Sequence, residues 1–228
     1  MAAVSEEMPW DLYREIHKAL RLALFDVTAL AGTGSTGDAP RTAHLVELWR
    51  EVAFLLKGHH GHEDEFVDLL VQRHAPDLRD DLEREHDIAD DLIASLSASA
   101  DALANGGGSL PAATLQRFYL DLSGFTSLYL RHLDVEERVV MPRLNAAMSS
   151  AELADVTNAI RGSVPPPEMC VFVRYMVRGM NYPERVDMLG GMFAGAPPDI
   201  FEMFRAAAQS ALTADEYAAV ATAAGFAG

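Results

Sequence analysis

The sequence predicts an all-α protein in which an up-down-up-down four-helix bundle is followed by an extension of short helices. Four long segments carry apolar residues with the 3.6-residue period of an amphipathic helix, and each is bounded by loop signals. No useful stretch shows the period-2 alternation of a strand. With 228 residues, 50% of them hydrophobic, the chain can form a bundle of about 150 residues plus an appendage. We place the boundary between residues 1–148 and residues 149–228.

The four long segments follow one another with short connections. A glycine-rich stretch over residues 32–38 ends the first, Ala75 and Pro76 stop the second, and a second glycine-rich stretch over residues 105–109 ends the third. The predicted helices cover Trp10–Leu30, Pro40–His74, Asp77–Ala104 and Pro111–Met148.

Histidines and glutamates stand on the stripe of each segment that should face the core. His17 lies on the first segment and His86 on the third. On the second and fourth segments a histidine is followed four residues later by a glutamate. Because residues i and i+4 share a helix face, each pair directs an imidazole and a carboxylate the same way. The predicted inward residues of these two segments include Leu55, His59, Glu63, Phe66 and Leu70, and Tyr129, His132, Glu136 and Val139.

The same side chains fall at one height in the predicted bundle. In an up-down-up-down bundle, the starts of the first and third helices and the ends of the second and fourth share one end. At ~1.5 Å per residue, the six candidates lie between roughly 10 and 24 Å from that end. Four helices can therefore aim four imidazoles and two carboxylates at one buried region.

Carboxylates at the core positions Glu63 and Glu136 need partners, because an unpaired buried charge is costly. A metal-free network of Glu–His hydrogen bonds would explain one such pair. Two pairs and two further histidines at the same height favour a metal centre, and imidazole with carboxylate suits Fe, Mn or Zn. Six donors, two of them carboxylates able to bridge, suit a pair of redox metals better than a tetrahedral zinc.

Residues 149–228 differ in pattern from the long segments. Ser149-x-x-Glu152 and Thr213-x-x-Glu216 are capping boxes, and proline-containing breaks mark four or five short helices. The region is rich in methionine and lacks histidine. We expect it to pack on the bundle as a cap or as a homo-oligomer surface.

Composition excludes several classes of function. The net charge of −16 argues against nucleic-acid binding, which requires a basic surface. The single cysteine, Cys170, rules out an internal disulfide and a cysteine-based zinc site. The N-terminus lacks the basic and apolar regions of a signal peptide, and no apolar run reaches the ~18–20 residues of a membrane span. We therefore expect a cytoplasmic protein without membrane partners.

The constellation of His17, His59-x-x-x-Glu63, His86 and His132-x-x-x-Glu136 resembles that of the hemerythrin-like (HHE cation-binding) family over about residues 9–148. The resemblance implies a four-helix bundle that holds a non-haem di-iron centre. Glu63 and Glu136 would bridge the two irons, and the four histidines would be terminal ligands.

The sequence departs from oxygen-carrying hemerythrins at two positions. Their third helix carries His-x-x-x-His, whereas this chain has Asp90 at the second position. Their fourth helix carries His-x-x-x-x-Asp, which would select Glu137 rather than Glu136. One terminal nitrogen is therefore missing, or replaced by Asp90 or water. Such an open, oxygen-rich site favours reactivity or sensing over reversible oxygen carriage.

Neighbouring residues offer weaker candidates. His60 and His62 flank the inward stripe, so we expect both to lie behind the ligands or at the surface. His62, Asp90 and Glu137 remain further candidate ligands. Tyr13 and Tyr129 lie one turn before His17 and His132, as core residues or as hydrogen-bond donors to a metal-bound species. A ferritin-like centre would need paired Glu-x-x-His motifs, and among these helices only Glu83-x-x-His86 has that spacing.

The sequence thus predicts a non-haem di-iron protein that binds, senses or reacts with O₂, peroxide or NO. One alternative is an enzyme that turns over peroxide or NO at the same centre. Another is an interaction module in which iron occupancy orders the bundle.

Overall fold

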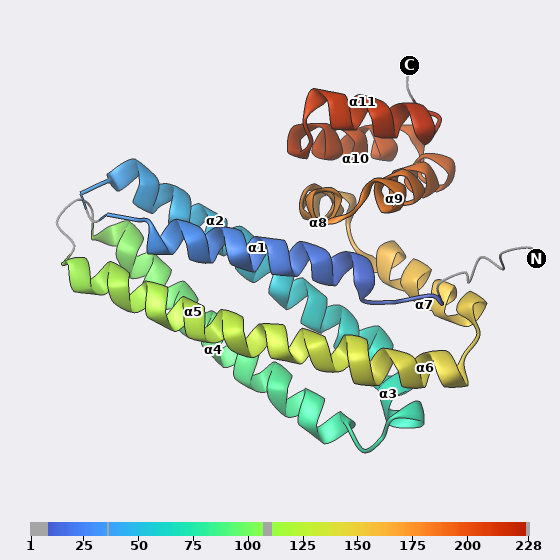
Figure 1. Ribbon diagram of the computed structural model, residues 1–228, viewed down its shortest axis with the longest axis horizontal. Helices are drawn as coiled ribbons and strands as arrows, with labels where there is room; N and C mark the ends of the chain where they lie inside the picture. The colour runs from blue at the N-terminus through green and yellow to red at the C-terminus, as the bar shows by residue number, and fades with distance from the viewer. Residues whose placement is uncertain (1–8, 36, 107–110, 227–228) are drawn as a thin grey trace, which may run out of the picture.

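The computed structural model describes residues 9–35, 37–106 and 111–226, and it confirms the all-α fold (Figure 1). Within these ranges the chain forms helices and no strands. None of these helices is both long and apolar enough to cross a membrane. The N-terminal residues used to argue against a signal peptide, and most of the predicted loop over 105–109, lie outside the described ranges.

The four predicted long helices form an antiparallel bundle. The first, α1, ends at the glycine-rich stretch, as the sequence predicts, and the fourth, like the second, continues beyond its buried glutamate. In Figure 1 these four rods run side by side along the long axis of the molecule. Their observed bounds are α1 (Arg14–Gly32), α2 (Ala39–His62) continued by α3 (Asp68–His74), α4 (Arg79–Asn105), and α5 (Ala112–Val135) continued by α6 (Met141–Ala147).

Two π-helical turns interrupt the second and fourth rods, and both begin at a glutamate of the candidate site. One covers Glu63–Val67 and the other Glu136–Val140. In each, the first amide after the turn donates to the carbonyl of the glutamate five residues earlier. Such turns insert one extra residue into an α-helix and are frequent at functional sites.

The inserted residue corrects the predicted inward stripe beyond each glutamate. We expected Phe66 and Leu70 to be buried on the second rod, but Val67 and Val71 take those positions. On the fourth rod Val140 is fully buried in place of the predicted Val139. The physical reason is the π turn: it delays the buried face by one residue, which the 3.6-residue period cannot anticipate.

The buried core is divided into two apolar clusters with a polar layer between them. Tyr13, the residue before α1, belongs to the smaller cluster and Leu20 of α1 to the larger one, with His17 between them. On α4, His86 stands in the same way between Leu82 and Ala89. The partly buried His86 and the buried histidines and glutamates thus form one layer across the bundle, at the height that the sequence predicts.

Five short helices follow the bundle and pack on one side of it (Figure 1). The predicted capping boxes at Ser149 and Thr213 are present, and a third begins at Asn181. Helix α8 packs mainly on α1 and α10. The short helices are α7 (Ser150–Ser163), α8 (Pro166–Gly179), α9 (Tyr182–Gly195), α10 (Pro198–Ala211) and α11 (Ala214–Ala223).

The contact between α8 and α1 is close enough to require a glycine. A Cβ atom added to Gly179 would lie 2.9 Å from the backbone carbon and oxygen of Lys18. Real Cβ atoms do not approach backbone so closely, so only glycine allows the two helices to meet here. This approach anchors the C-terminal helices one residue along the chain from His17.

Candidate metal centre

The bundle brings six of the predicted side chains together in two overlapping groups. One group contains His17, His59, Glu63 and Glu136, and the donor atoms of these four lie within 4.8 Å of one another. The other contains Glu63, His86, His132 and Glu136 with the same spread. Each group therefore has two imidazoles of its own, and the two groups share both carboxylates.

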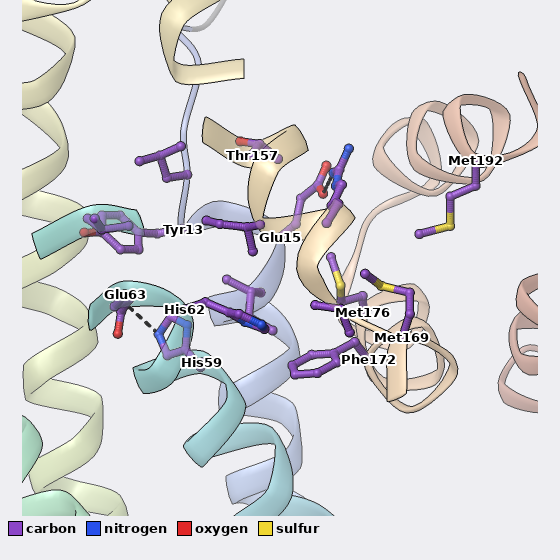
Figure 2. Close-up of a pocket in the computed structure, with 16 residues that line it drawn as sticks. Tyr13, Glu15, His59, His62, Glu63, Thr157, Met169, Phe172, Met176 and Met192 are labelled. Atoms are coloured by element: carbon purple, nitrogen blue, oxygen red, sulfur yellow. Dashed lines mark hydrogen bonds and ion pairs between the residues drawn. The ribbon is translucent and has the colours of Figure 1, made fainter. Parts of the chain in front are cut away.

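Each of the two shared glutamates directs one carboxylate oxygen at the first group and the other oxygen at the second. Glu63 Oε1 lies 3.4 Å from His59 Nε2 (dashed in Figure 2), and its Oε2 lies 3.4 Å from His86 Nε2. Glu136 spans the layer in the same way, because Oε2 lies 3.4 Å from His17 Nε2 and Oε1 lies 3.3 Å from His132 Nε2. Two carboxylates in this arrangement can bridge two cations.

Several polar atoms of this layer are buried without a partner. Both carboxylate oxygens of Glu63, Oε2 of Glu136 and Nε2 of His60 are shielded from solvent and accept or donate no hydrogen bond. Leaving a buried polar atom unsatisfied costs about 1–3 kcal/mol each, and more when it is charged. Carboxylate oxygens and imidazole nitrogens are donors that divalent transition metals bind, so these residues fit a metal pair.

The outer nitrogens of the histidines fix their orientation. His17 Nδ1 donates to Glu137 Oε1 at 3.0 Å, and His132 Nδ1 donates to Glu85 Oε2 at 3.0 Å. A carboxylate only accepts, so it holds the ring hydrogen on Nδ1 and leaves the lone pair of Nε2 facing the centre. Carboxylate partners of this kind are usual behind metal-binding histidines.

Burial and mutual repulsion make the two glutamates unlike in the metal-free protein. Burial, and then the charge of Glu136, raise the pKa of Glu63 well above its usual value. Burial opposes ionisation of Glu136 as well, but the attraction of His132 outweighs it and holds the pKa of Glu136 well below normal. The pKa of His132 rises to about 9 because Glu136 and Glu85 outweigh the effect of burial. Without metal, therefore, the surroundings of Glu63 disfavour the ionised form that a bridging role requires.

His60 is the residue that the sequence reasoning placed differently. We expected it behind the ligands or at the surface, but it is 2% exposed and its ring stacks on His86 with a centroid distance of 4.5 Å. Donor atoms of His60, His86 and His132 lie within 4.8 Å of one another. Burial lowers the pKa of His60 to about 4, so the ring is neutral and able to act as a donor.

Asp90 explains how His60 could have been found from the sequence. His60 Nδ1 donates to Asp90 Oδ1 at 3.0 Å, so Asp90 lies behind His60 while its own side chain is 56% exposed. One turn after His86, where hemerythrins carry a histidine, this chain has the carboxylate that supports a histidine from the neighbouring helix. Two features of the sequence pointed to His60: the absence of a histidine at position 90, and the presence of a second histidine next to His59.

The other weaker candidates lie outside the converging layer. Glu137 pairs with Arg21 at 2.6 Å and supports His17 from behind. His62 is partly exposed, and its ring faces Phe172 of α8 at a centroid distance of 6.1 Å. Neither belongs to a group of donor atoms that could hold a metal among the described residues.

Both predicted tyrosines border the layer. Tyr13 is 3% exposed with its ring 4.9 Å from that of His17, and Tyr129 is fully buried with its ring 5.4 Å from that of His60. The hydroxyl of Tyr129 is buried without a partner. Burial raises the pKa of both phenols well above normal, so both carry their hydrogen and can donate it.

The fold and this layer define a helical-bundle protein with a histidine- and carboxylate-lined metal site. The hemerythrin HHE cation-binding domain matches residues 8–144, which is more than half of the chain. The chain therefore belongs to the hemerythrin HHE cation-binding domain family, and its bundle is a cation-binding domain.

A more distant similarity connects the chain to a plant protein. Over 175 residues it is 27% identical to the zinc finger protein BRUTUS-like of Arabidopsis thaliana. The match covers 75% of this chain but only 14% of that protein, so the likeness concerns a small part of a much longer polypeptide. No solved structure matches the chain significantly.

Proposed function

We propose that the protein binds two iron ions in the polar layer and uses them to bind, sense or react with O₂, peroxide or NO. The observation that carries this proposal is the sharing of Glu63 and Glu136 between two histidine pairs. One ion would be held by His17 and His59, the other by His86 and His132, and both by the two carboxylates. His60 would complete the second position.

This donor count makes the two positions unequal. The first would have two nitrogens and two carboxylate oxygens, whereas the second would have a third nitrogen from His60. Iron held by histidine and carboxylate with open positions is the arrangement at which small oxidants attach. When bound, the iron pair would supply electrons to such a ligand, and the position held by His17 and His59 would have fewer protein donors.

The residues of the chain prepare the site for this chemistry. The carboxylates of Glu137, Glu85 and Asp90 hold three imidazoles with Nε2 inward. The two apolar clusters border the layer on either side along the bundle axis. The phenol of Tyr13, near His17, can donate a hydrogen bond into the first position.

Metal analysis of the full chain tests the proposal. After anaerobic loading with ferrous salt, we expect a stoichiometry near two irons per chain and a change in the ultraviolet–visible spectrum on exposure to O₂ or NO. The variant His86→Ala should lose one of the two irons, whereas His44→Ala, at an exposed position near the start of α2, should retain both. One zinc per chain, or no spectral change on exposure, would contradict the proposal.

Turnover is the second candidate function. It rests on the same open position, since a ligand that can leave after reaction allows repeated cycles. Multiple turnovers of peroxide or NO, abolished in Glu63→Ala, would establish an enzyme. A single stoichiometric reaction per iron pair would establish a binding or sensing protein instead.

A further inference from the structure

The C-terminal helices line a partly open pocket that leads to the metal layer. The pocket has a volume of about 100 Å³ and lies between α1, the π turn after α2, α7 and α8. In Figure 2, Glu63 and His59 lie at one end of it and Met192 at the other, with Tyr13 beside the layer. Of the two histidine pairs, only the first contributes a residue, His59, so the pocket reaches the position that has fewer donors.

The wall of this pocket is largely apolar. Leucine, isoleucine, valine, phenylalanine and methionine side chains form most of it. Met169 and Met176 lie together on the side away from Glu63, and Met192 lies farther from Glu63 on another helix (Figure 2). Two polar side chains of the outer wall already have partners. Arg161 pairs with Glu15 at 2.9 Å, and the hydroxyl of Thr157 donates to the carbonyl of Leu153 at 3.2 Å.

A pocket of this chemistry favours an uncharged apolar occupant. Apolar cavities of ~150 Å³ stay free of water and bind benzene or xenon, whereas a water molecule needs ~2–4 polar partners to be held. At about 100 Å³, this pocket accommodates a small neutral molecule. O₂ and NO meet these conditions, whereas hydrogen peroxide, with two hydroxyl groups, loses its hydrogen bonds on entry.

The layer is also reached by a second pocket of opposite character. It has a volume of about 270 Å³ and reaches Glu63, His86 and Glu136 from the side of α4. Carboxylates such as Asp64, Asp87 and Asp90 dominate its wall. Polar solutes thus have a route to the layer that avoids the apolar pocket, and the two routes can be tested separately.

Half of the apolar pocket is built from residues beyond the match to the hemerythrin domain, which ends at residue 144. Thr157, Ile160 and Arg161 come from α7, Met176 from α8 and Met192 from α9. The pocket is therefore formed by what this chain adds to the domain, and it gives residues 149–228 a role that their sequence did not suggest.

We propose that this pocket is the binding site and entry route for a small neutral apolar ligand, O₂ or NO rather than peroxide, on its way to the first metal position. The role of the pocket as an entry route rests on the proposed iron pair, but ligand binding in the pocket can be tested without metal. Ile160 and Val164, both partly exposed residues of its wall, can be enlarged without touching the polar layer.

The first experiment uses xenon with the metal-free full chain. We expect a saturable ¹²⁹Xe chemical-shift change in the unmodified protein that is lost in Ile160→Phe and Val164→Phe. Ile200→Phe, an equally partly buried position on α10 outside the pocket, serves as the matched control and should bind xenon normally. Circular dichroism identifies any variant that fails to fold. If one of the two pocket variants does not fold, xenon binding by the other tests the inference.

The second experiment uses stopped-flow mixing with the iron-loaded chain. In the two filled variants we expect the rate of NO binding to fall roughly tenfold while the rate of reaction with hydrogen peroxide changes less than about twofold. Xenon binding that persists in both folded variants would overturn the inference. An equal slowing of NO and peroxide would overturn it as well. If instead the chain binds no iron but xenon enters as expected, the proposed function fails and the pocket stands.

Discussion

The stability of the variant Glu63→Met distinguishes two roles for Glu63: a metal ligand, or a member of a structural hydrogen-bond network. Methionine has a similar length and no charge, so it fills the position without leaving a polar atom. If Glu63 exists to hold metal, the metal-free protein gains stability from this substitution. If Glu63 is a structural residue, the protein loses stability.

The size of the gain follows from the two unpartnered oxygens of Glu63. At ~1–3 kcal/mol for each, removing both is worth roughly 2–6 kcal/mol. Because burial raises the pKa of Glu63, the metal-free protein relieves part of this cost by protonation. We therefore expect roughly 2–3 kcal/mol, which corresponds to a rise in Tm of about 4–12 °C for a chain of this length.

Urea and thermal unfolding in the presence of a chelator measure this gain. Glu65→Met is the matched control, because Glu65 is exposed in the same π turn and should change stability little. Added ferrous iron should stabilise the unmodified protein, by about 2.7 kcal/mol at a hundredfold excess over Kd, and leave Glu63→Met unaffected. A metal-free Glu63→Met protein that is less stable than the unmodified one would refute the reasoning.

Three further predictions concern positions outside the layer. Glu137→Gln should weaken iron binding by roughly 10–100-fold by releasing the ring of His17, as measured by competition with a chromogenic chelator, and unchanged affinity would remove Glu137 from the site. Gly179→Ala should cost about 1–3 kcal/mol in urea unfolding because it forces α8 from α1, while Gly162→Ala, with open space at its Cβ, should be neutral or stabilising. Thr213→Ala should lower stability by about 1 kcal/mol through the lost cap of α11, and Thr213→Ser should restore it.

The sequence by itself determined the helical class, the four long segments and the convergence of six donors at one height. These follow from regularities of the chain, since the 3.6-residue period fixes which residues share a face and the fixed rise per residue fixes their height. The capping boxes at Ser149 and Thr213 were equally readable, because they depend on residues three positions apart.

Tertiary structure decided what the helices face. Because of the π turns at Glu63 and Glu136, Val67 is buried where Phe66 was expected, and Val140 where Val139 was expected. The period of an α-helix cannot predict where the backbone changes to a π turn. His60 became part of the layer because its ring stacks on His86 and its Nδ1 donates to Asp90, both on α4. The apolar pocket exists only because helices distant in the chain pack beside the layer. Periodicity orders residues around their own helix axis, whereas contacts between helices depend on rotation and packing that no single segment encodes.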